Sequence, residues 1–267
     1  MLNGGREVRL YPAKVIEGAE EVFLDGSKEK CFLLFHGYTG YPKELEEYGR
    51  YIHENTGFTI YIPRLPGHAT SGKDFLTVTY RDWLRKAIDS YADLKSKCDK
   101  VYVGGLSMGG ILTTLVASLY SPEKIILLSP AHKVYDQKYK CIVYFMSLFK
   151  DRIEKENVEI PEINKNDPVR MKLWEEYWKY NWIKPAKEFF RLQSLGVKML
   201  HLVRSKSLII TSKADTTVPY TVANFLESRM NGEVKKIILE KSGHVVVRGE
   251  EKKIVFEESA RWLIDET

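Results

Sequence analysis

Short apolar runs alternate with longer amphipathic stretches along most of the chain. The run Cys31–Phe35 is apolar at every position, as expected of a strand that is buried on both faces of a parallel sheet. Within residues 80–97, apolar side chains such as Trp83, Leu84 and Ile88 recur at the spacing of one helix face. The alternation predicts an α/β fold, with a mostly parallel central sheet flanked by helices.

The pattern assigns a series of strands and helices to the two ends of the chain. Strands are predicted at 13–24, 31–35, 58–62, 101–103, 124–128, 207–211 and 235–239. Helices are predicted at 43–55, 80–97, 110–119, 220–230 and 254–264. Asp25 and Gly26 are typical of a hairpin turn after the first strand.

Between these ends the alternation stops. From residue 131 to about residue 204 the sequence looks helical throughout, with no strand between. We therefore expect one α/β core formed by residues 1–130 and 204–267, with residues 131–203 inserted as a helical unit. A length of 267 residues suits a single domain with such an insertion.

Two apolar patterns mark the insertion. The first is an aromatic stripe at helical spacing, formed by Trp174, Tyr177, Trp178 and Trp182. The second is the stretch 142–149. Three interpretations stay open: the insertion roofs a pocket, it packs on the core without touching a ligand, or it exposes an aromatic face with the basic residues Arg170, Lys172 and Lys179. Neighbouring acidic residues argue against the third.

The composition is that of an ordinary globular protein, with 44% hydrophobic and 29% charged residues, and excludes a disordered chain. The formal net charge is +5, from 41 basic and 36 acidic residues that are interleaved along the sequence. A nucleic-acid binder of this size usually carries a one-sided basic run, which this sequence lacks. No nucleic-acid partner is therefore expected.

The sequence shows no targeting or membrane segment. Residues 1–6 lack the apolar stretch of a signal peptide, and no apolar run approaches the roughly 20 residues of a membrane-spanning helix. Stable membrane insertion is not expected. Cys31, Cys98 and Cys141 are far apart and form no CxxC pair, so we interpret them as buried or half-buried free thiols in a reducing cytoplasm.

Ser107 is the first candidate for chemistry. It is the centre of Gly105-Leu106-Ser107-Met108-Gly109, between a predicted strand and a predicted helix. In that context Gly-x-Ser-x-Gly predicts a nucleophile elbow, a turn so tight that side chains at the flanking positions would collide with neighbouring backbone. The turn lifts the hydroxyl above the sheet at a helix N-terminus, where developing negative charge is stabilised. An ordinary loop serine is the alternative.

A serine nucleophile needs a base, and the base needs an acid. His244 follows the last predicted strand, and Asp215 follows the strand at 207–211. Each has a plain alternative, a surface or capping histidine and an N-terminal helix cap. However, all three residues follow strand ends, where α/β sheets bind ligands, and their order Ser, Asp, His is the one expected of an α/β-hydrolase. They predict a triad of Ser107, His244 and Asp215.

Attack by the serine creates an alkoxide, which requires an oxyanion hole. One donor should be the backbone N–H of Met108, the residue after the nucleophile. The other should come from the loop after Cys31–Phe35, where His36-Gly37 brings the backbone close and Tyr38 offers its N–H. Tyr38 and Met108 are therefore the expected oxyanion-hole and substrate-binding residues, whereas His36 is expected to brace the loop.

Together these motifs resemble the bacterial carboxylesterase and monoacylglycerol lipase branch of the α/β-hydrolase superfamily. The residues that carry the resemblance are His36-Gly37-Tyr38-Thr39-Gly40, Pro66-Gly67-His68, Asp82-Trp83, Gly104–Gly110, Asp215 and Ser242-Gly243-His244. The resemblance spans both ends of the chain and weakens in the insertion, and Ala69 stands where relatives often carry a second glycine. It implies the same triad and oxyanion amides, and a helical lid over 131–203 between the sixth and seventh strands.

The sequence therefore predicts a serine hydrolase that cleaves carboxylic esters through an acyl-enzyme on Ser107, with short- to medium-chain acyl esters or monoacylglycerols as substrates. No metal or organic cofactor is implied, the partner is a small-molecule ester, and a monomer or homodimer is expected. A cinnamoyl or feruloyl esterase, a thioesterase, an amidase and a C–C bond hydrolase remain alternatives on the same triad. Ser107 disfavours an aspartate-nucleophile dehalogenase, and the intact catalytic set disfavours a catalytically silent binding module.

Overall fold

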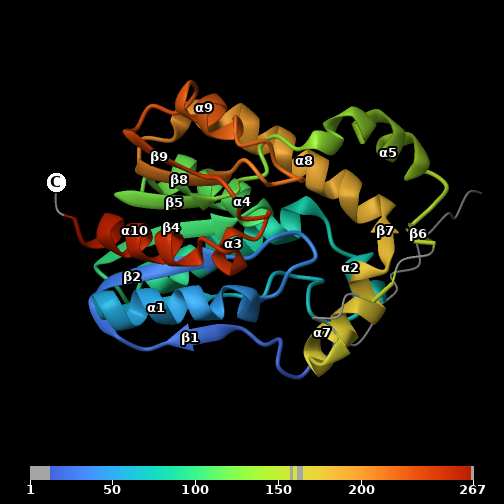
Figure 1. Ribbon diagram of the computed structural model, residues 1–267, viewed down its shortest axis with the longest axis horizontal. Coiled ribbons are helices and arrows are strands. Elements are labelled where there is room, and N and C mark those ends of the chain that lie inside the picture. The colour runs from blue at the N-terminus through green and yellow to red at the C-terminus, as the bar shows by residue number, and fades with distance from the viewer. Residues whose placement is uncertain (1–12, 157–158, 161–164, 266–267) are drawn as a thin grey trace, which may run out of the picture.

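The computed structural model describes residues 13–156, 159–160 and 165–265, so that residues 1–6, on which the signal-peptide expectation rests, lie outside the described part. A seven-stranded sheet has the order β1-β3-β2-β4-β5-β8-β9. Its neighbouring strands are parallel except for β1 and β3, which are antiparallel. The predicted α/β architecture with a mostly parallel sheet is confirmed (Figure 1).

Most of the elements predicted at the two ends of the chain have close counterparts. The strands are β1 Val22–Leu24, β2 Ser27–Phe35, β3 Phe58–Ile62, β4 Lys100–Leu106, β5 Lys124–Leu128, β8 Lys206–Ser212 and β9 Val234–Leu239. The helices are η1 Pro42–Leu45, α1 Glu46–Thr56, α2 Gly72–Phe75, α3 Tyr80–Lys95, α4 Met108–Tyr120, α9 Val222–Glu227, η5 Val246–Arg248 and α10 Lys252–Ile264. The largest difference is the first strand, which has only 3 residues.

Helices cover both faces of the sheet (Figure 1). Strand β2 shows how the sequence achieves this, because successive side chains of a strand point to opposite faces. Cys31, Leu33 and Phe35 enter one apolar core, and Phe32 and Leu34 enter the other. Helices α3, α4 and α9 contribute to the first core together with α8 (Ile183–Met199), and α1 and α10 contribute to the second.

The predicted hairpin at Asp25-Gly26 is wrong, because β1 pairs with β3 and not with β2. The Gly26 N–H donates to Oγ1 of Thr59 (3.0 Å), which itself donates to the carbonyl of Ser27 (3.0 Å). A Cβ at position 26 would lie 2.6 Å from the carbonyl oxygen of Gly57. Glycine therefore lets the chain pass close to the start of β3, so that β1 and β2 lie on opposite sides of that strand.

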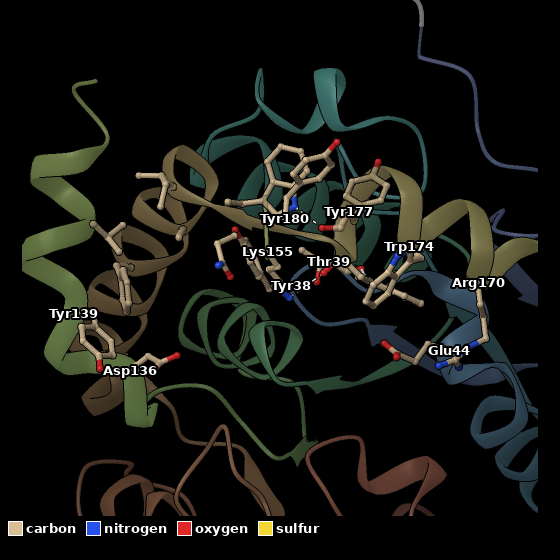
Figure 2. A pocket seen from close by; sticks show the side chains of 17 residues that line it. Tyr38, Thr39, Glu44, Asp136, Tyr139, Lys155, Arg170, Trp174, Tyr177 and Tyr180 are labelled. Carbon is tan, nitrogen blue, oxygen red and sulfur yellow. Dashed lines mark hydrogen bonds between the residues drawn. The ribbon is translucent and has the colours of Figure 1, made fainter. Parts of the chain in front are cut away.

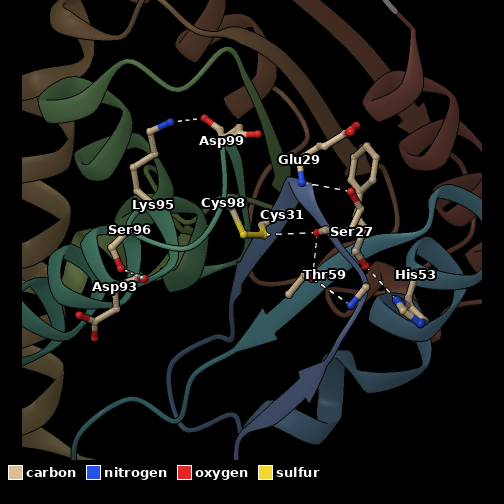
Figure 3. The surroundings of a disulfide bond; sticks show 12 residues. Ser27, Glu29, Cys31, His53, Thr59, Asp93, Lys95, Ser96, Cys98 and Asp99 are labelled. Atoms are coloured by element: carbon tan, nitrogen blue, oxygen red, sulfur yellow. Dashed lines mark hydrogen bonds between the residues drawn. A yellow bond between two sulfur atoms is a disulfide. The ribbon is translucent and has the colours of Figure 1, made fainter.

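Cys31 and Cys98 form a disulfide, with 6.2 Å between their Cα atoms (Figure 3). The interpretation as free thiols is wrong for these two residues, and Cys141, which is free, is exposed rather than buried. The bond joins the buried part of β2 to the loop between α3 and β4, across 67 residues of sequence. In a chain-entropy account, closing a loop of this length stabilises the fold by about 4 kcal/mol.

The chain between β5 and β8, here called the β5–β8 segment, is mostly but not entirely helical. It contains η2 Tyr135–Tyr139, α5 Lys140–Met146, β6 Arg152–Glu154, α7 Pro168–Leu173, η3 Trp174–Trp178, β7 Tyr180–Trp182, α8 and η4 Leu200–Leu202. Strands β6 and β7 pair antiparallel, so the expectation of a stretch without strands is wrong. The guanidinium of Arg152 lies 4.0 Å from the Tyr180 ring centre, a cation–π contact that joins the two strands.

Among the residues that the structure describes, five strands of the main sheet, β1 to β5, precede this segment. Because residues 1–12 lie outside the described part, the placement between the sixth and seventh strands that the resemblance implied stays a prediction. The carboxyl ends of β4, β8 and β9 lead into the loops that carry Ser107, Asp215 and His244.

Candidate active site

Ser107 lies in the turn between β4 and α4. Its φ of +57° and ψ of −114° are strained for a residue with a side chain. A Cβ at Gly105 would collide with the backbone of Gly109, and a Cβ at Gly109 would collide with the carbonyl group of Phe35. The two glycines are therefore required for this turn, which holds Ser107, only 7% exposed, at the N-terminus of α4.

His244 and Asp215 lie in contact after two other strands, His244 after β9 and Asp215 after β8. The distance from Nδ1 of His244 to Oδ2 of Asp215 is 2.8 Å. Oδ1 of Asp215 accepts hydrogen bonds from the backbone N–H groups of Thr217 (2.7 Å) and Val218 (2.9 Å). These two amides fix the carboxylate, so that its second oxygen is directed at the imidazole.

The charge on Asp215 determines the tautomer of the histidine. Burial alone would raise the pKa of Asp215, but the hydrogen bond and charge of His244 and the amides of Val218 and Thr217 outweigh burial and hold the pKa below its usual value. Asp215 is therefore an acceptor, and Nδ1 of His244 carries a proton. In the neutral imidazole this leaves Nε2 as the nitrogen that is able to accept a proton.

Ser107 and His244 line one small cavity of about 180 Å³, together with Tyr38. Gly37 approaches the serine closely, since a Cβ at this position would lie 3.3 Å from Cβ of Ser107. Met108 directly follows Ser107 as the first residue of α4, where a backbone N–H has no partner within the helix. The structure thus brings the five residues singled out from the sequence to one place.

His36 braces the loop that leads to Tyr38. Its Nε2 accepts a hydrogen bond from the backbone N–H of Leu65 (3.1 Å), so its Nδ1 donates to the carbonyl of Gly37 (3.0 Å). Burial lowers the pKa of His36 to about 4, although the hydrogen bond to Gly37 acts in the opposite direction. Both ring nitrogens of the neutral His36 side chain therefore form hydrogen bonds, as expected of a residue that braces the loop.

Trp178 of the β5–β8 segment reaches the same loop. It lines the small cavity, and its indole N–H donates to the carbonyl of Thr39 (3.0 Å). Thr39 has a φ of +57° and directly follows Tyr38, so the contact holds the loop at a strained residue. The sequence offered Trp178 only as a member of an aromatic stripe, because nothing local relates it to a residue 139 positions away.

A second cavity, of about 820 Å³, adjoins the first and is called here the large chamber. Tyr38, Thr39, Glu44 and Trp178 line both. Figure 2 shows Asp136 and Tyr139 at one end of the chamber, Glu44 and Arg170 at the other, and Lys155 between them. Burial raises the pKa of Glu44, although nearby Arg248, His244 and Arg170 lower it.

The aromatic residues of the predicted stripe all line the large chamber, but they do not form one helix face. Residues 174–178 form a π-helical turn, with the N–H of Lys179 bonded to the carbonyl of Trp174 (3.2 Å), and Trp182 belongs to β7. The second apolar stretch does not roof this chamber, because only Val143 lines it. Four of its other large members, Ile142, Phe145, Leu148 and Phe149, are 53–74% exposed.

The loop that carries His244 is held by Glu251, a residue that the sequence did not single out. Its carboxylate accepts hydrogen bonds from the backbone N–H groups of Glu240 (3.1 Å), Lys241 (2.9 Å) and Ser242 (2.8 Å), and from the Ser242 hydroxyl (2.9 Å). Burial alone would raise the pKa of Glu251, but these four bonds bring it down to about 2. The carboxylate therefore fixes the segment just before His244.

Replacing Glu251 by glutamine is expected to destabilise the fold at neutral pH, and the difference should vanish in acid. Because the pKa is depressed in the folded state, the charged group stabilises the fold fully above its usual value of 4.5 and loses this effect as the pH falls towards 2. Urea unfolding at several pH values measures the difference. The control is Glu257→Gln on α10, the helix that begins directly after Glu251, because the ion pairs of Glu257 lie at the surface. A difference for Glu251→Gln that stays constant down to pH 2 would contradict the expectation.

Neither a metal site nor a membrane span is found in the part of the chain that the structure describes. No three His, Cys, Asp or Glu side chains of residues 13–156, 159–160 and 165–265 are grouped in a way that would hold a metal ion. None of the helices formed by these residues is both long and apolar enough to cross a membrane.

Comparisons with known proteins point to one family. Residues 32–257 match the alpha/beta hydrolase family. Over 107 residues the chain is 36% identical to a thermostable monoacylglycerol lipase of Bacillus sp. (strain H-257), a match that spans 40% of this chain and 41% of that protein. Over 242 residues it is 24% identical to a carboxylesterase of Bacillus subtilis (strain 168), spanning 89% and 93%.

A solved structure has the same fold over nearly the whole chain. It comes from work on LipS and LipT, two metagenome-derived lipolytic enzymes, and its TM-score is 0.80 over 94% of this chain and 99% of that one. Its sequence identity to this chain is 23%, so the likeness shows the fold and not the activity.

Proposed function

Because this chain belongs to the alpha/beta hydrolase family, we propose that it is a serine hydrolase of carboxylic esters, with Ser107 as nucleophile, His244 as general base and Asp215 as its acid partner. The observation that carries the proposal is the 2.8 Å contact between His244 and Asp215, which orients an imidazole in the cavity that Ser107 lines. The relatives named monoacylglycerol lipase and carboxylesterase support esters as the substrates.

The proposed mechanism is acyl transfer through an acyl-enzyme. Nε2 of His244 takes the proton of Ser107 as Oγ attacks the ester carbonyl, and the backbone N–H groups of Tyr38 and Met108 stabilise the oxyanion. The alcohol then leaves with the proton held by His244. In the second half, His244 deprotonates a water molecule, which attacks the acyl-enzyme and releases the acid and free Ser107.

Residues 131–203 are proposed to act as the lid of this site. Trp178, which lines the small cavity, and the walls of the large chamber support this role.

The short- to medium-chain acyl preference and the monomeric or dimeric state stay predictions. The cytoplasmic location also stays a prediction, and the Cys31–Cys98 bond speaks against a reducing compartment, since such bonds persist mainly in oxidising ones and in hyperthermophiles.

A fluorophosphonate probe tests the proposal, because it reacts with serines activated by a neighbouring base. We expect the native protein to be labelled at Ser107 and to hydrolyse p-nitrophenyl esters, monoacylglycerols and alkyl esters. Activity confined to feruloyl esters would move the assignment to the cinnamoyl esterase alternative. A native protein that is not labelled and hydrolyses no ester would instead be a silent binding module.

The Trp178→Phe variant is expected to lower kcat for p-nitrophenyl butanoate by about 3- to 10-fold, with a smaller effect on KM. The substitution keeps an aromatic ring in the cavity but removes the N–H that holds Thr39, and one lost hydrogen bond corresponds to about 1 kcal/mol. Steady-state kinetics measure the effect. The matched control is Trp262→Phe on α10, whose indole N–H has no partner among the described residues, and an equal loss in both variants would contradict the role of the Thr39 contact.

A further inference from the structure

The large chamber does not have the lining of an alkyl-chain pocket. Of the 17 residues in the described part of the chain that line it, only Val143, Ile183 and Ala186 are aliphatic. Eight are aromatic, and the other six are polar or charged. The six are Thr39, Glu44, Asp136, Lys155, Arg170 and Asn181. A binding site for a plain hydrocarbon chain would show the opposite balance of aliphatic and charged side chains.

Several of these polar side chains have hydrogen-bonding capacity to spare. The side chains of Glu44, Asp136 and Asn181 make no hydrogen bond or ion pair with any other residue that the structure describes. The ammonium group of Lys155 donates to the carbonyl of Trp178 (2.8 Å), which leaves two of its three N–H donors for a ligand. The chamber therefore offers both acceptors and donors to whatever occupies it.

An alkyl chain would be a poor occupant of such a chamber. It would displace the water that reaches the half-buried Glu44 and the exposed Asp136 and Asn181 without offering hydrogen bonds in its place, which is unfavourable for every group left unpaired. A hydroxyl group both donates and accepts. A hydroxyl-rich ligand therefore suits the carboxylates of Glu44 and Asp136 as well as the N–H groups of Lys155 and Asn181.

The aromatic side chains suit the same class of ligand. The C–H faces of a sugar ring are apolar and slightly electropositive, whereas the face of an aromatic ring is negative. Figure 2 shows Trp174, Tyr177 and Tyr180 between the charged groups at the two ends of the chamber. A sugar ring that packs on these aromatic residues would point its hydroxyl groups outward, towards the polar side chains.

Size and position fit an ester of such a ligand. The volume of about 820 Å³ lies within the range of roughly 300–1,000 Å³ that is typical of pockets for small organic ligands. Because Tyr38, Thr39, Glu44 and Trp178 line both cavities, the chamber adjoins the cavity of Ser107. A sugar held in the chamber is therefore placed next to the nucleophile.

We propose that the ester cleaved at Ser107 is an acyl ester of a sugar or a similar cyclic polyol, whose ring occupies the large chamber. The inference rests on the proposed function and names the substrate class of the same site. The reaction is the acyl transfer given above: the bond between the acyl carbon and the sugar oxygen breaks, and that oxygen leaves with the proton from His244. Water then attacks the acyl-enzyme and releases the free acid and Ser107.

The test compares two esters with the same acyl group, 6-O-butanoylglucose and hexyl butanoate. The wild-type kcat/KM is expected to be at least about 10-fold higher for the sugar ester, because a site built for hydroxyl groups discriminates against a substrate that lacks them. Asn181→Leu and Glu44→Gln should each lower this ratio by about 3-fold or more. Asn55→Leu, an exposed asparagine on α1 that is remote from the chamber, is the control and should keep the wild-type ratio.

The outcomes separate this inference from the proposed function. Equal kcat/KM values for the two esters, or a preference for hexyl butanoate, would overturn the inference alone. A preference for the sugar ester that neither Asn181→Leu nor Glu44→Gln reduces would also overturn it, since the preference would then come from elsewhere. If neither ester is hydrolysed and the fluorophosphonate probe does not label Ser107, both proposals fail.

Discussion

Replacing Ser107 by alanine is expected to lower kcat for ester hydrolysis by about 10⁴- to 10⁶-fold, since the variant has no oxygen to form the acyl-enzyme. The turn itself should persist, because it is held by main-chain groups. The N–H of Ser107 donates to the carbonyl of Leu128 (2.9 Å), and the carbonyl of Ser107 accepts from Ala131 (3.1 Å). Kinetics with p-nitrophenyl butanoate measure the loss, and thermal unfolding should stay close to the wild type.

Ser129 provides a matched control for this substitution. It also follows a strand of the sheet, it is fully buried, and its φ is positive at +41°. Its hydroxyl has no hydrogen-bond partner among the described residues, and it does not line either cavity. Ser129→Ala should therefore hydrolyse esters at close to the wild-type rate. Turnover by Ser107→Ala within tenfold of the wild type would exclude Ser107 as the nucleophile.

The sheet could be predicted from the sequence because its signal is local. Each inner strand is a short apolar run, and in β2 the alternation of Cys31, Leu33 and Phe35 with Phe32 and Leu34 is sufficient to cover both faces. The candidate site could be predicted from the same order of strands. In a parallel sheet the carboxyl ends of the strands meet at one edge, so residues after β4, β8 and β9 come together however far apart they are in sequence.

The errors concern contacts between distant residues that no local pattern encodes. The Cys31–Cys98 disulfide depends on how the loop after α3 lies beside β2, and the turn after β1 is held by Thr59, which accepts the Gly26 N–H from 33 residues away. The contact of Glu251 with the loop before His244 is likewise one that no local pattern encodes. Nothing in the sequence distinguishes Glu251 from the other glutamates, and only the folded chain shows the three backbone N–H groups that donate to its carboxylate.

The β5–β8 segment was the hardest part of the chain to predict, because its side chains contact the core and line the cavities instead of lying on one face of a single helix. Tyr177 directs its hydroxyl to the Gly67 carbonyl (3.0 Å), whereas Trp178, the next residue, donates to Thr39. Both contacts are made from a π-helical turn, which is wider than an α-helical one and also places Trp174 at the chamber. The helical period of 3.6 residues therefore identified the aromatic residues that line the large chamber, but not the directions in which their side chains point.

Replacing Asp215 by asparagine is expected to lower kcat by about 10⁴-fold, although the side chain keeps its shape. The amide oxygen of the new residue should take the place of Oδ1, which accepts from Thr217 and Val218, so that its NH₂ group faces Nδ1 of His244. Nδ1 must then accept this N–H, and the ring proton moves to Nε2. With Nε2 protonated, His244 is no longer able to take the proton of Ser107.

Asp167→Asn is the matched control, because this aspartate has the same local geometry without a histidine. Its Oδ1 accepts from the backbone N–H groups of Val169 (2.9 Å) and Arg170 (3.1 Å) at the start of α7, a position where asparagine caps as well as aspartate. Both variants should unfold at similar temperatures, and only Asp215→Asn should lose ester turnover and fluorophosphonate labelling of Ser107. Activity of Asp215→Asn within tenfold of the wild type would mean that the tautomer of His244 does not depend on Asp215.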